Sequence, residues 1–111
     1  MEFIITEYQH CDLIEINGRI DSYTSPNIDD ALKSLFIDGH FNVVVDLRSV
    51  TYLSSSGLLV FVHAQKRCKS QNLGEIVISN ASQNIYSNFQ LAGFNQIFKF
   101  YNDVVSAIGS F

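Results

Sequence analysis

The chain has 111 residues, of which 47% are hydrophobic and 13% are aromatic, so it has the material for one hydrophobic core rather than two. With only 16% charged residues, it does not have the composition of a disordered chain. The formal net charge of −4 argues against nucleic acid as a partner, because proteins that bind the nucleic-acid phosphate backbone normally carry an excess of basic residues.

The cysteines, the histidines and the N-terminus indicate neither a cross-linked nor a membrane-inserted protein. Cys11 and Cys68 are too few for a disulfide scaffold, and we expect two ordinary buried thiols. The histidines show no metal-ligand spacing, so we expect no metal site. The N-terminus lacks the basic segment of a signal peptide, and the longest apolar run, residues 58–62, is far shorter than the ~20 residues that cross a bilayer. We therefore expect a cytoplasmic protein.

The N-terminal part of the chain predicts a β-hairpin followed by a helix. Residues 3–8 and 11–17 have the composition of strands, and the tight turn between them lets them pair as a hairpin that ends at Gly18. Ser25 is a natural N-cap, and Pro26 suits the first helical position because no backbone N–H is needed there. The apolar stripe of this helix then follows at residues 28, 31, 32, 35 and 36.

A strand, a helix and a second strand follow in the order of a βαβ unit. Residues 42–47 are apolar and β-branched, as in a strand that is covered on both faces. A loop at residues 54–57 leads into a helix from Leu58 to about Gln71, and residues 75–78 form the next buried strand. This order predicts a parallel strand pair with a right-handed crossover.

The last turn of this helix carries Lys66, Arg67 and Lys69. Cations near a helix C-terminus interact favourably with the helix dipole. The simplest interpretation is a solvated helix end, and the alternative is a surface that meets an acidic partner.

The C-terminal part of the chain predicts a helix, a short strand and a last helix. The first of these helices has its apolar face at residues 85, 89 and 92, and the strand covers residues 97–100. Asn102 or Asp103 then caps the last helix. Taken together, the elements predict the α/β class, with a mixed β-sheet of about five strands and about four helices packed on it, all on one side or nearly so.

None of the familiar catalytic signatures is present. There is no GxSxG elbow, no glycine-rich phosphate loop and no HExxH metal motif. We therefore expect a binding protein rather than an enzyme, with no cofactor of its own.

The segment Ser54-Ser55-Ser56-Gly57 is the most informative part of the sequence. In structural terms, its serines cap a helix and its glycine allows close packing. In functional terms, one hydroxyl accepts a phosphoryl group at a helix start, where unpaired backbone N–H groups favour an anion. The residues alone favour the structural interpretation and leave the functional one open.

Three segments together resemble the STAS domain family, and especially its bacterial anti-sigma factor antagonists. Residues 45–58, VDLRSVTYLSSSGL, are similar to the family's strand with a V-x-D/N-L pattern, its aromatic-apolar pair and its D-S-S/A-G-L motif. Residues 17–21, NGRID, resemble the family's G-x-[IL]-D turn, and residues 89–94, FQLAGF, resemble its late F-x-x-S/A-G-L/F segment. The resemblance spans essentially the whole chain and implies a single STAS-like domain over residues 1–111.

The resemblance also implies which residues form the site. The family's phosphoacceptor serine falls on Ser55, two positions before Gly57, and Ser54 and Ser56 are the alternatives. The residue before the acceptor is usually aspartate in the family, and here it is Ser54, which makes the loop less acidic and adds a hydroxyl. The expected partner-binding residues belong to two loops: Asp21, Ser22, Tyr23, Thr24, Ser54, Ser56, Gly57 and Leu58.

By this resemblance the protein is an anti-sigma factor antagonist. Its unphosphorylated form would dock on an anti-sigma factor that is also a serine kinase, and would thereby release a sigma factor. Phosphorylation of the loop serine would end the complex, with ATP and Mg²⁺ belonging to the kinase, and a serine phosphatase would reset the switch. The alternative is an accessory subunit of a membrane lipid-transport ATPase or of a stress-signalling scaffold. We expect no transmembrane segment and a monomer or weak dimer.

Overall fold

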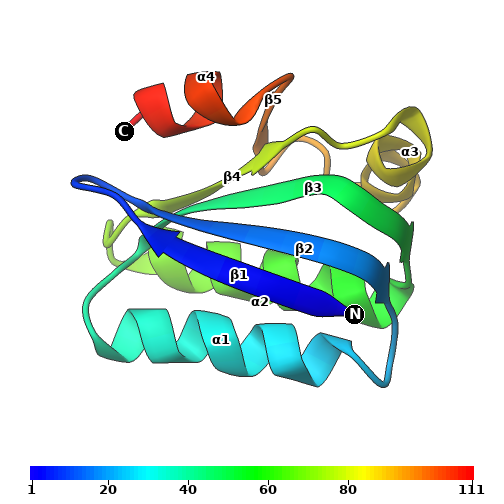
Figure 1. The fold of residues 1–111 in the computed structure, drawn as a ribbon, viewed down its shortest axis with the longest axis horizontal. Coiled ribbons are helices and arrows are strands. Elements are labelled where there is room, and N and C mark those ends of the chain that lie inside the picture. The colour runs from blue at the N-terminus through cyan, green and yellow to red at the C-terminus, as the bar shows by residue number, and fades with distance from the viewer.

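The computed structural model describes residues 1–111 and contains one mixed sheet with helices on both faces (Figure 1). The sheet has five strands in the order β1-β2-β3-β4-β5, and only the β1–β2 pair is antiparallel. The α/β fold with a mixed five-stranded sheet, predicted from the sequence, is confirmed. The strands are β1 (Glu2–Glu7), β2 (Asp12–Ile20), β3 (Asn42–Leu53), β4 (Glu75–Ser79) and β5 (Lys99–Tyr101).

Four helices cover the sheet: α1 (Ser25–Ile37), α2 (Ser55–Ser70), α3 (Gln83–Leu91) and α4 (Val104–Gly109). The first three contribute to one core of 21 buried residues. In contrast, α4 lies on the opposite face, where Ala107 joins a smaller cluster of five buried residues. The expectation of helices on one side, or nearly so, is met by α1, α2 and α3, with α4 as the exception.

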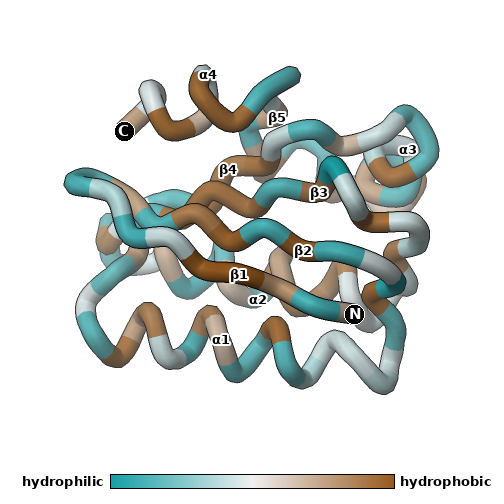
Figure 2. The backbone as a smooth tube through the Cα atoms, viewed as in Figure 1, coloured by the Kyte–Doolittle hydropathy of each residue, from teal (hydrophilic) through white to brown (hydrophobic).

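The two clusters explain the uninterrupted apolar run at the start of β3. Val43 and Val45 belong to the large core under α1 and α2, whereas Val44 belongs to the small cluster under α4. Because successive side chains of a strand point to opposite faces, a strand covered on both faces has apolar residues at every position. Figure 2 shows hydrophobic segments that recur along the central strands. β3, α2 and β4 form the expected βαβ unit, in which β3 and β4 are parallel.

A buried glutamine joins α2 to the sheet near β5. The side-chain nitrogen of Gln65 donates to the carbonyl oxygens of Ile76 at 3.0 Å and Ile97 at 2.8 Å, and its oxygen accepts the N–H of Ile76 at 2.7 Å. β4 pairs with β5 only from Val77 onward, so Ile76 has no partner in β5. The Gln65 amide takes the place of that missing strand partner.

Several predicted boundaries are wrong, and each error has a local cause. β2 does not end at Gly18 but continues to Ile20, because Gly18 adopts a φ of +101° next to an irregularity in its pairing with β3. A residue without Cβ tolerates that conformation inside a strand. The N-cap of α1 is Thr24 rather than Ser25, which is buried in the first turn. Ala92 is the C-cap of α3 and is exposed, so it does not share the apolar face of that helix.

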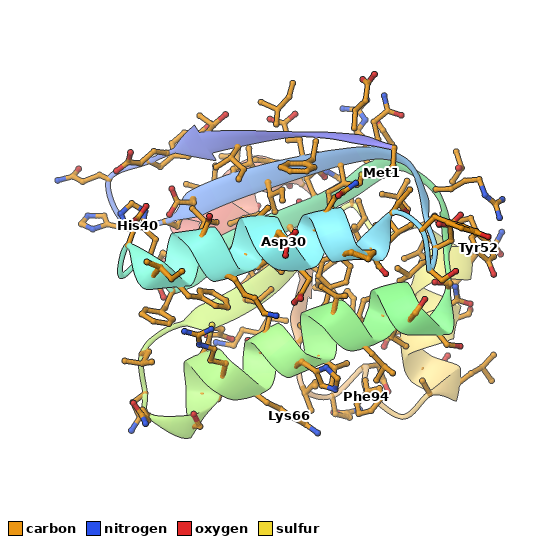
Figure 3. All side chains as sticks on the ribbon, turned by 90° about the horizontal axis from the view of Figure 1, so that it is seen from below. Met1, Asp30, His40, Tyr52, Lys66 and Phe94 are labelled. Carbon is orange, nitrogen blue, oxygen red and sulfur yellow. The ribbon has the colours of Figure 1, made fainter.

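The basic end of α2 makes contacts within the chain. Lys66 lies over the ring of Phe94, 6.0 Å from its centroid, as the labelled side chains in Figure 3 show. Arg67 lies over the ring of Phe36 at 5.2 Å, and Lys69 pairs with the carboxylate that begins β4 at 3.6 Å. These contacts favour the interpretation of a solvated helix end over that of a surface for an acidic partner.

Both cysteines are buried free thiols, as the sequence predicted. Burial raises the pKa of the Cys68 thiol to about 11, despite the cations beside it. Burial and the neighbouring Asp12 carboxylate raise the pKa of the Cys11 thiol as well. Both groups therefore stay protonated at neutral pH and are poor nucleophiles. None of the four helices is long and apolar enough to cross a membrane.

Candidate functional site

The two segments expected to form the site leave the sheet side by side, at the right-hand ends of β2 and β3 in Figure 1. β2 and β3 are parallel neighbours, and their last residues, Ile20 and Leu53, are register partners. The N–H of Ser54 donates to the carbonyl of Ile20 at 2.8 Å. Residues 21–24 and 54–58 therefore start at one point on the carboxyl edge of the sheet, where α/β folds commonly place binding sites.

The first segment is a tight turn organised by Asp21. Its Oδ1 accepts the N–H groups of Tyr23 at 3.0 Å and Thr24 at 3.1 Å. Partial desolvation opposes the charge of Asp21, but these hydrogen bonds, the Thr24 hydroxyl and the nearby Arg19 guanidinium together lower its pKa. The turn leaves Tyr23 90% exposed and Ser22 exposed beside it, whereas Thr24 is half-buried. A large aromatic side chain therefore projects into solvent next to the second segment.

The second segment is the first turn of α2 and not the loop that the sequence suggested. α2 begins at Ser55, and Ser54 is its N-cap, with an Oγ that accepts the N–H of Gly57 at 3.1 Å. The same oxygen lies 2.9 Å from the Oγ of Ser56, so these two hydroxyls are hydrogen-bonded to each other. Both hydroxyls are thus engaged in the local structure of the helix start.

Ser55 differs from its two neighbours because its exposed hydroxyl makes no hydrogen bond within the chain. The N–H groups of Ser55 and Ser56 also donate to no protein acceptor, as expected for the first turn of a helix. An anion attached to Ser55 would meet these free donors and the positive end of the helix dipole. The arrangement therefore suits a serine that accepts a phosphoryl group. No three His, Cys, Asp or Glu side chains gather into a potential metal site.

Gly57 and Leu58 are buried and pack the first turn of α2 against the rest of the domain. A Cβ on Gly57 would lie 2.7 Å from Cγ2 of Ile20 and 2.9 Å from Cδ1 of Leu53. Only glycine lets the start of α2 approach the ends of β2 and β3 this closely. Gly57 thus sets the spacing between the two segments rather than presenting a side chain to a partner.

A cleft of about 390 Å³ beside Ser55 is lined by further side chains to which the sequence motifs assigned no role at the site. Tyr52, at the end of β3, is 42% exposed, and Leu91, at the end of α3, is 88% exposed. Figure 3 shows Tyr52 at the N-terminal end of α2. α3 is held next to the cleft by a hydrogen bond from Asn88 Nδ2 to the Leu53 carbonyl at 3.0 Å. The exposure of Tyr52 and the proximity of α3 both depend on tertiary structure, because the pairing of β2 with β3 has register shifts in this region.

Comparison with known proteins assigns this chain to a family. A sequence model described as the STAS domain matches residues 2–107. The chain belongs to the STAS family. A curated relative from Listeria monocytogenes, named anti-sigma-B factor antagonist, is 32% identical over 93 residues, which cover 84% of this chain and 80% of the relative.

Solved structures share the fold of this STAS domain at low sequence identity. An anti-sigma factor antagonist from Mycobacterium paratuberculosis has a TM-score of 0.87 at 18% identity, covering 98% of this chain and 92% of that chain. The Bacillus cell-fate determinant SpoIIAA in its phosphorylated form has a TM-score of 0.78 at 14% identity, covering 98% of each chain. The assignment to the STAS family made from the sequence motifs is therefore confirmed.

Proposed function

We propose that this STAS domain is an anti-sigma factor antagonist, a binding protein that docks on an anti-sigma factor and is switched off by phosphorylation of Ser55. The observation that carries the proposal is the exposed, unbonded hydroxyl of Ser55 at the N-terminus of α2, beside a cleft that the exposed side chains of Tyr52 and Leu91 also line. The name of the Listeria relative supports the choice of an anti-sigma factor as the partner.

The docking surface consists of residues 21–24, the first turn of α2, and the side chains of Tyr52 and Leu91. Tyr23, Tyr52 and Leu91 are large side chains exposed to solvent in the unbound protein. Aromatic side chains are enriched in the cores of protein–protein interfaces, where they lose their contact with water. Tyr23 and Tyr52 are therefore the expected anchors for the anti-sigma factor, and Leu91 adds exposed apolar surface.

The switch is a phosphoryl transfer carried out by the partner, which is also a serine kinase. The Oγ of Ser55 forms a bond to the γ-phosphorus of ATP, and the bond from that phosphorus to the ADP oxygen breaks. The hydroxyl proton leaves to a base of the kinase, and ADP is released. ATP and Mg²⁺ are held by the kinase, so this chain supplies only the acceptor hydroxyl.

The phosphate acts through charge on the docking surface. It adds about −1.5 to −2 charges at neutral pH. Binding of the partner would then strip water from this charge without supplying a compensating cation, and this desolvation opposes the complex. Ser55 lies outside the core, and a negative charge at a helix N-terminus is stabilising by about 0.3–1 kcal/mol, so the fold is expected to stay intact.

The remaining parts of the proposal concern the cellular context. The protein acts in the cytoplasm of a bacterium as a monomer or weak dimer, and it regulates transcription without catalysing a reaction. A serine phosphatase removes the phosphate from Ser55 and restores binding.

The test is incubation with the candidate anti-sigma kinase, ATP and Mg²⁺, followed by mass spectrometry of the peptide that contains the serines. Ser55→Ala should abolish the added phosphate and keep partner binding, because only an uncommitted hydroxyl is lost. Ser54→Ala and Ser56→Ala are matched controls that should still be phosphorylated. Phosphate that persists in Ser55→Ala, or disappears only in one of the controls, contradicts the assignment of the acceptor.

A further inference from the structure

Arg19 is a cation at the edge of the docking surface, and its ion pair with Asp21 is weak. Arg19 and Asp21 are the only charged residues among residues 19–24, residues 52–58 and the α3 side chains that line the cleft. The Nε of Arg19 lies 3.9 Å from Oδ2 of Asp21, and the Arg19 side chain is 63% exposed. An exposed ion pair at this separation contributes little to stability. The guanidinium is therefore available to a stronger anion.

Tyr52 connects Arg19 to the neighbourhood of Ser55. Arg19 and Tyr52 are register partners in β2 and β3, and Cζ of Arg19 lies 4.3 Å from the centroid of the Tyr52 ring. Tyr52 and Ser55 line the same cleft. The backbone holds this arrangement, because the N–H of Ser54 is bonded to the carbonyl of Ile20, the residue after Arg19, at 2.8 Å. A group added to Ser55 thus lies beside a cleft whose lining includes Tyr52, the residue whose ring Arg19 contacts.

We propose that Arg19 binds the phosphate on Ser55, so that phosphorylation rearranges the docking surface as well as charging it. Hydrogen bonds from a guanidinium to phosphate oxygens are charge-assisted and stronger than a long surface ion pair. When Arg19 moves to the phosphate, Asp21 loses its cation and the Tyr52 ring loses its cation–π contact. The inference rests on the proposed function only in requiring that Ser55 be the phosphorylated residue.

Titration of the phosphate by ³¹P NMR tests this role of Arg19. Phosphoserine is introduced at position 55 by genetic encoding, and its second ionisation, near pH 6 in an unperturbed phosphoserine, is followed over about pH 4–8. A nearby cation favours the dianion and lowers this pKa. Arg19→Gln should therefore raise the phosphate pKa by about 0.3–1 unit, a two- to tenfold change in the ionisation constant.

Arg48→Gln is the matched control, because Arg48 is an exposed arginine of β3 outside the docking surface. The phosphate in this variant should titrate as in the parent phosphoprotein. Equal phosphate pKa values in Arg19→Gln and the parent, or an equal shift in Arg48→Gln, would overturn the proposal. A rise confined to Arg19→Gln supports it.

The titration is independent of the anti-sigma factor, because no kinase is needed to install the phosphate. If the unmodified protein fails to bind the anti-sigma factor, the proposed function fails while the result for Arg19 still stands. If the protein binds its partner but Arg19→Gln leaves the phosphate pKa unchanged, only the inference about Arg19 fails.

Discussion

Replacing Gly57 by alanine perturbs the contact that holds the start of α2 against the sheet. The added Cβ would lie 2.7 Å from Cγ2 of Ile20, 2.9 Å from Cδ1 of Leu53 and 3.2 Å from the Ile20 carbonyl oxygen. Ile20 is fully buried and branched at Cβ, so its methyl group cannot easily rotate away. The closest contact must widen by about 0.8 Å to reach the ~3.5 Å at which carbon atoms attract each other.

The expected loss of stability follows from two opposing effects. Overpacking of a well-packed core typically costs about 1–3 kcal/mol. The higher helix propensity of alanine offsets at most about 1 kcal/mol. Because contacts of 2.7 and 2.9 Å place this change in the upper part of that range, about 2–3 kcal/mol, we expect the free energy of unfolding to fall by about 1–2 kcal/mol. With about 2.1 cal/mol/K of unfolding entropy per residue, a chain of 111 residues should then melt about 4–9 °C lower.

Thermal unfolding followed by circular dichroism measures this change, and Gly109→Ala provides the matched control. Gly109 also lies in a helix, but a Cβ added there would meet no atom within 4 Å. The control should melt at the parent temperature or slightly above it, because alanine is the better helix former. If Gly57→Ala melts at the same temperature as the parent, or if Gly109→Ala loses as much stability as Gly57→Ala, the close approach at Gly57 is not what requires a glycine there.

Three further predictions concern stability and reactivity. Gln65→Leu should lower the free energy of unfolding, measured by chemical denaturation, by about 2–4 kcal/mol, because the buried backbone N–H and carbonyl of Ile76 lose their partner. A loss below ~1 kcal/mol would contradict this role, because water or repacking would then replace the amide. Cys68, whose pKa burial raises to about 11, should react with a disulfide reagent only after unfolding, and rapid reaction of the native protein would contradict its burial. Hydrogen bonds from Ser106 lower the pKa of Asp103 below its ordinary value of 3.8, so its stabilising contribution is present above that pH and is lost as the pH falls below it. Asp103→Asn should therefore make the acid-induced decrease in unfolding free energy shallower, and an unchanged pH profile would contradict this assignment.

The start of α2 shows where local sequence signals mislead. Ser54, Ser55 and Ser56 have modest helix propensity, and their run before a glycine is typical of a loop. In the fold, Ser54 caps the helix and Gly57 packs against Ile20, so the turn is held by contacts with a distant strand. The βαβ order was predictable, because it depends on hydrophobic patterns within each element.

The face of the sheet on which α4 packs was not predictable from the apolar pattern of the helix itself. The spacing of its apolar residues indicates that one side of the helix is buried, but not which side of the sheet it covers. That choice depends on Val44 and Val77, which present apolar side chains on the second face.

The candidate site was predictable only at the residues to which the family resemblance assigns a role. Residues 21–24 and the first turn of α2 were expected from the sequence, and the structure places them side by side. Arg19, Tyr52 and Leu91 lie within the matched segments but were not expected at the site, because their shared neighbourhood depends on strand register and on the packing of α3.

The central claim is that a phosphate on Ser55 weakens docking on the anti-sigma factor without unfolding the chain. The most direct test is the equilibrium affinity of the anti-sigma factor for the serine and phosphoserine forms of the protein, measured by isothermal titration calorimetry. We predict that the serine form binds and that the phosphoserine form binds at least ~10-fold more weakly, a difference of about 1.4 kcal/mol, while the melting temperatures agree within about 5 °C. Equal affinities of the two forms would contradict the account.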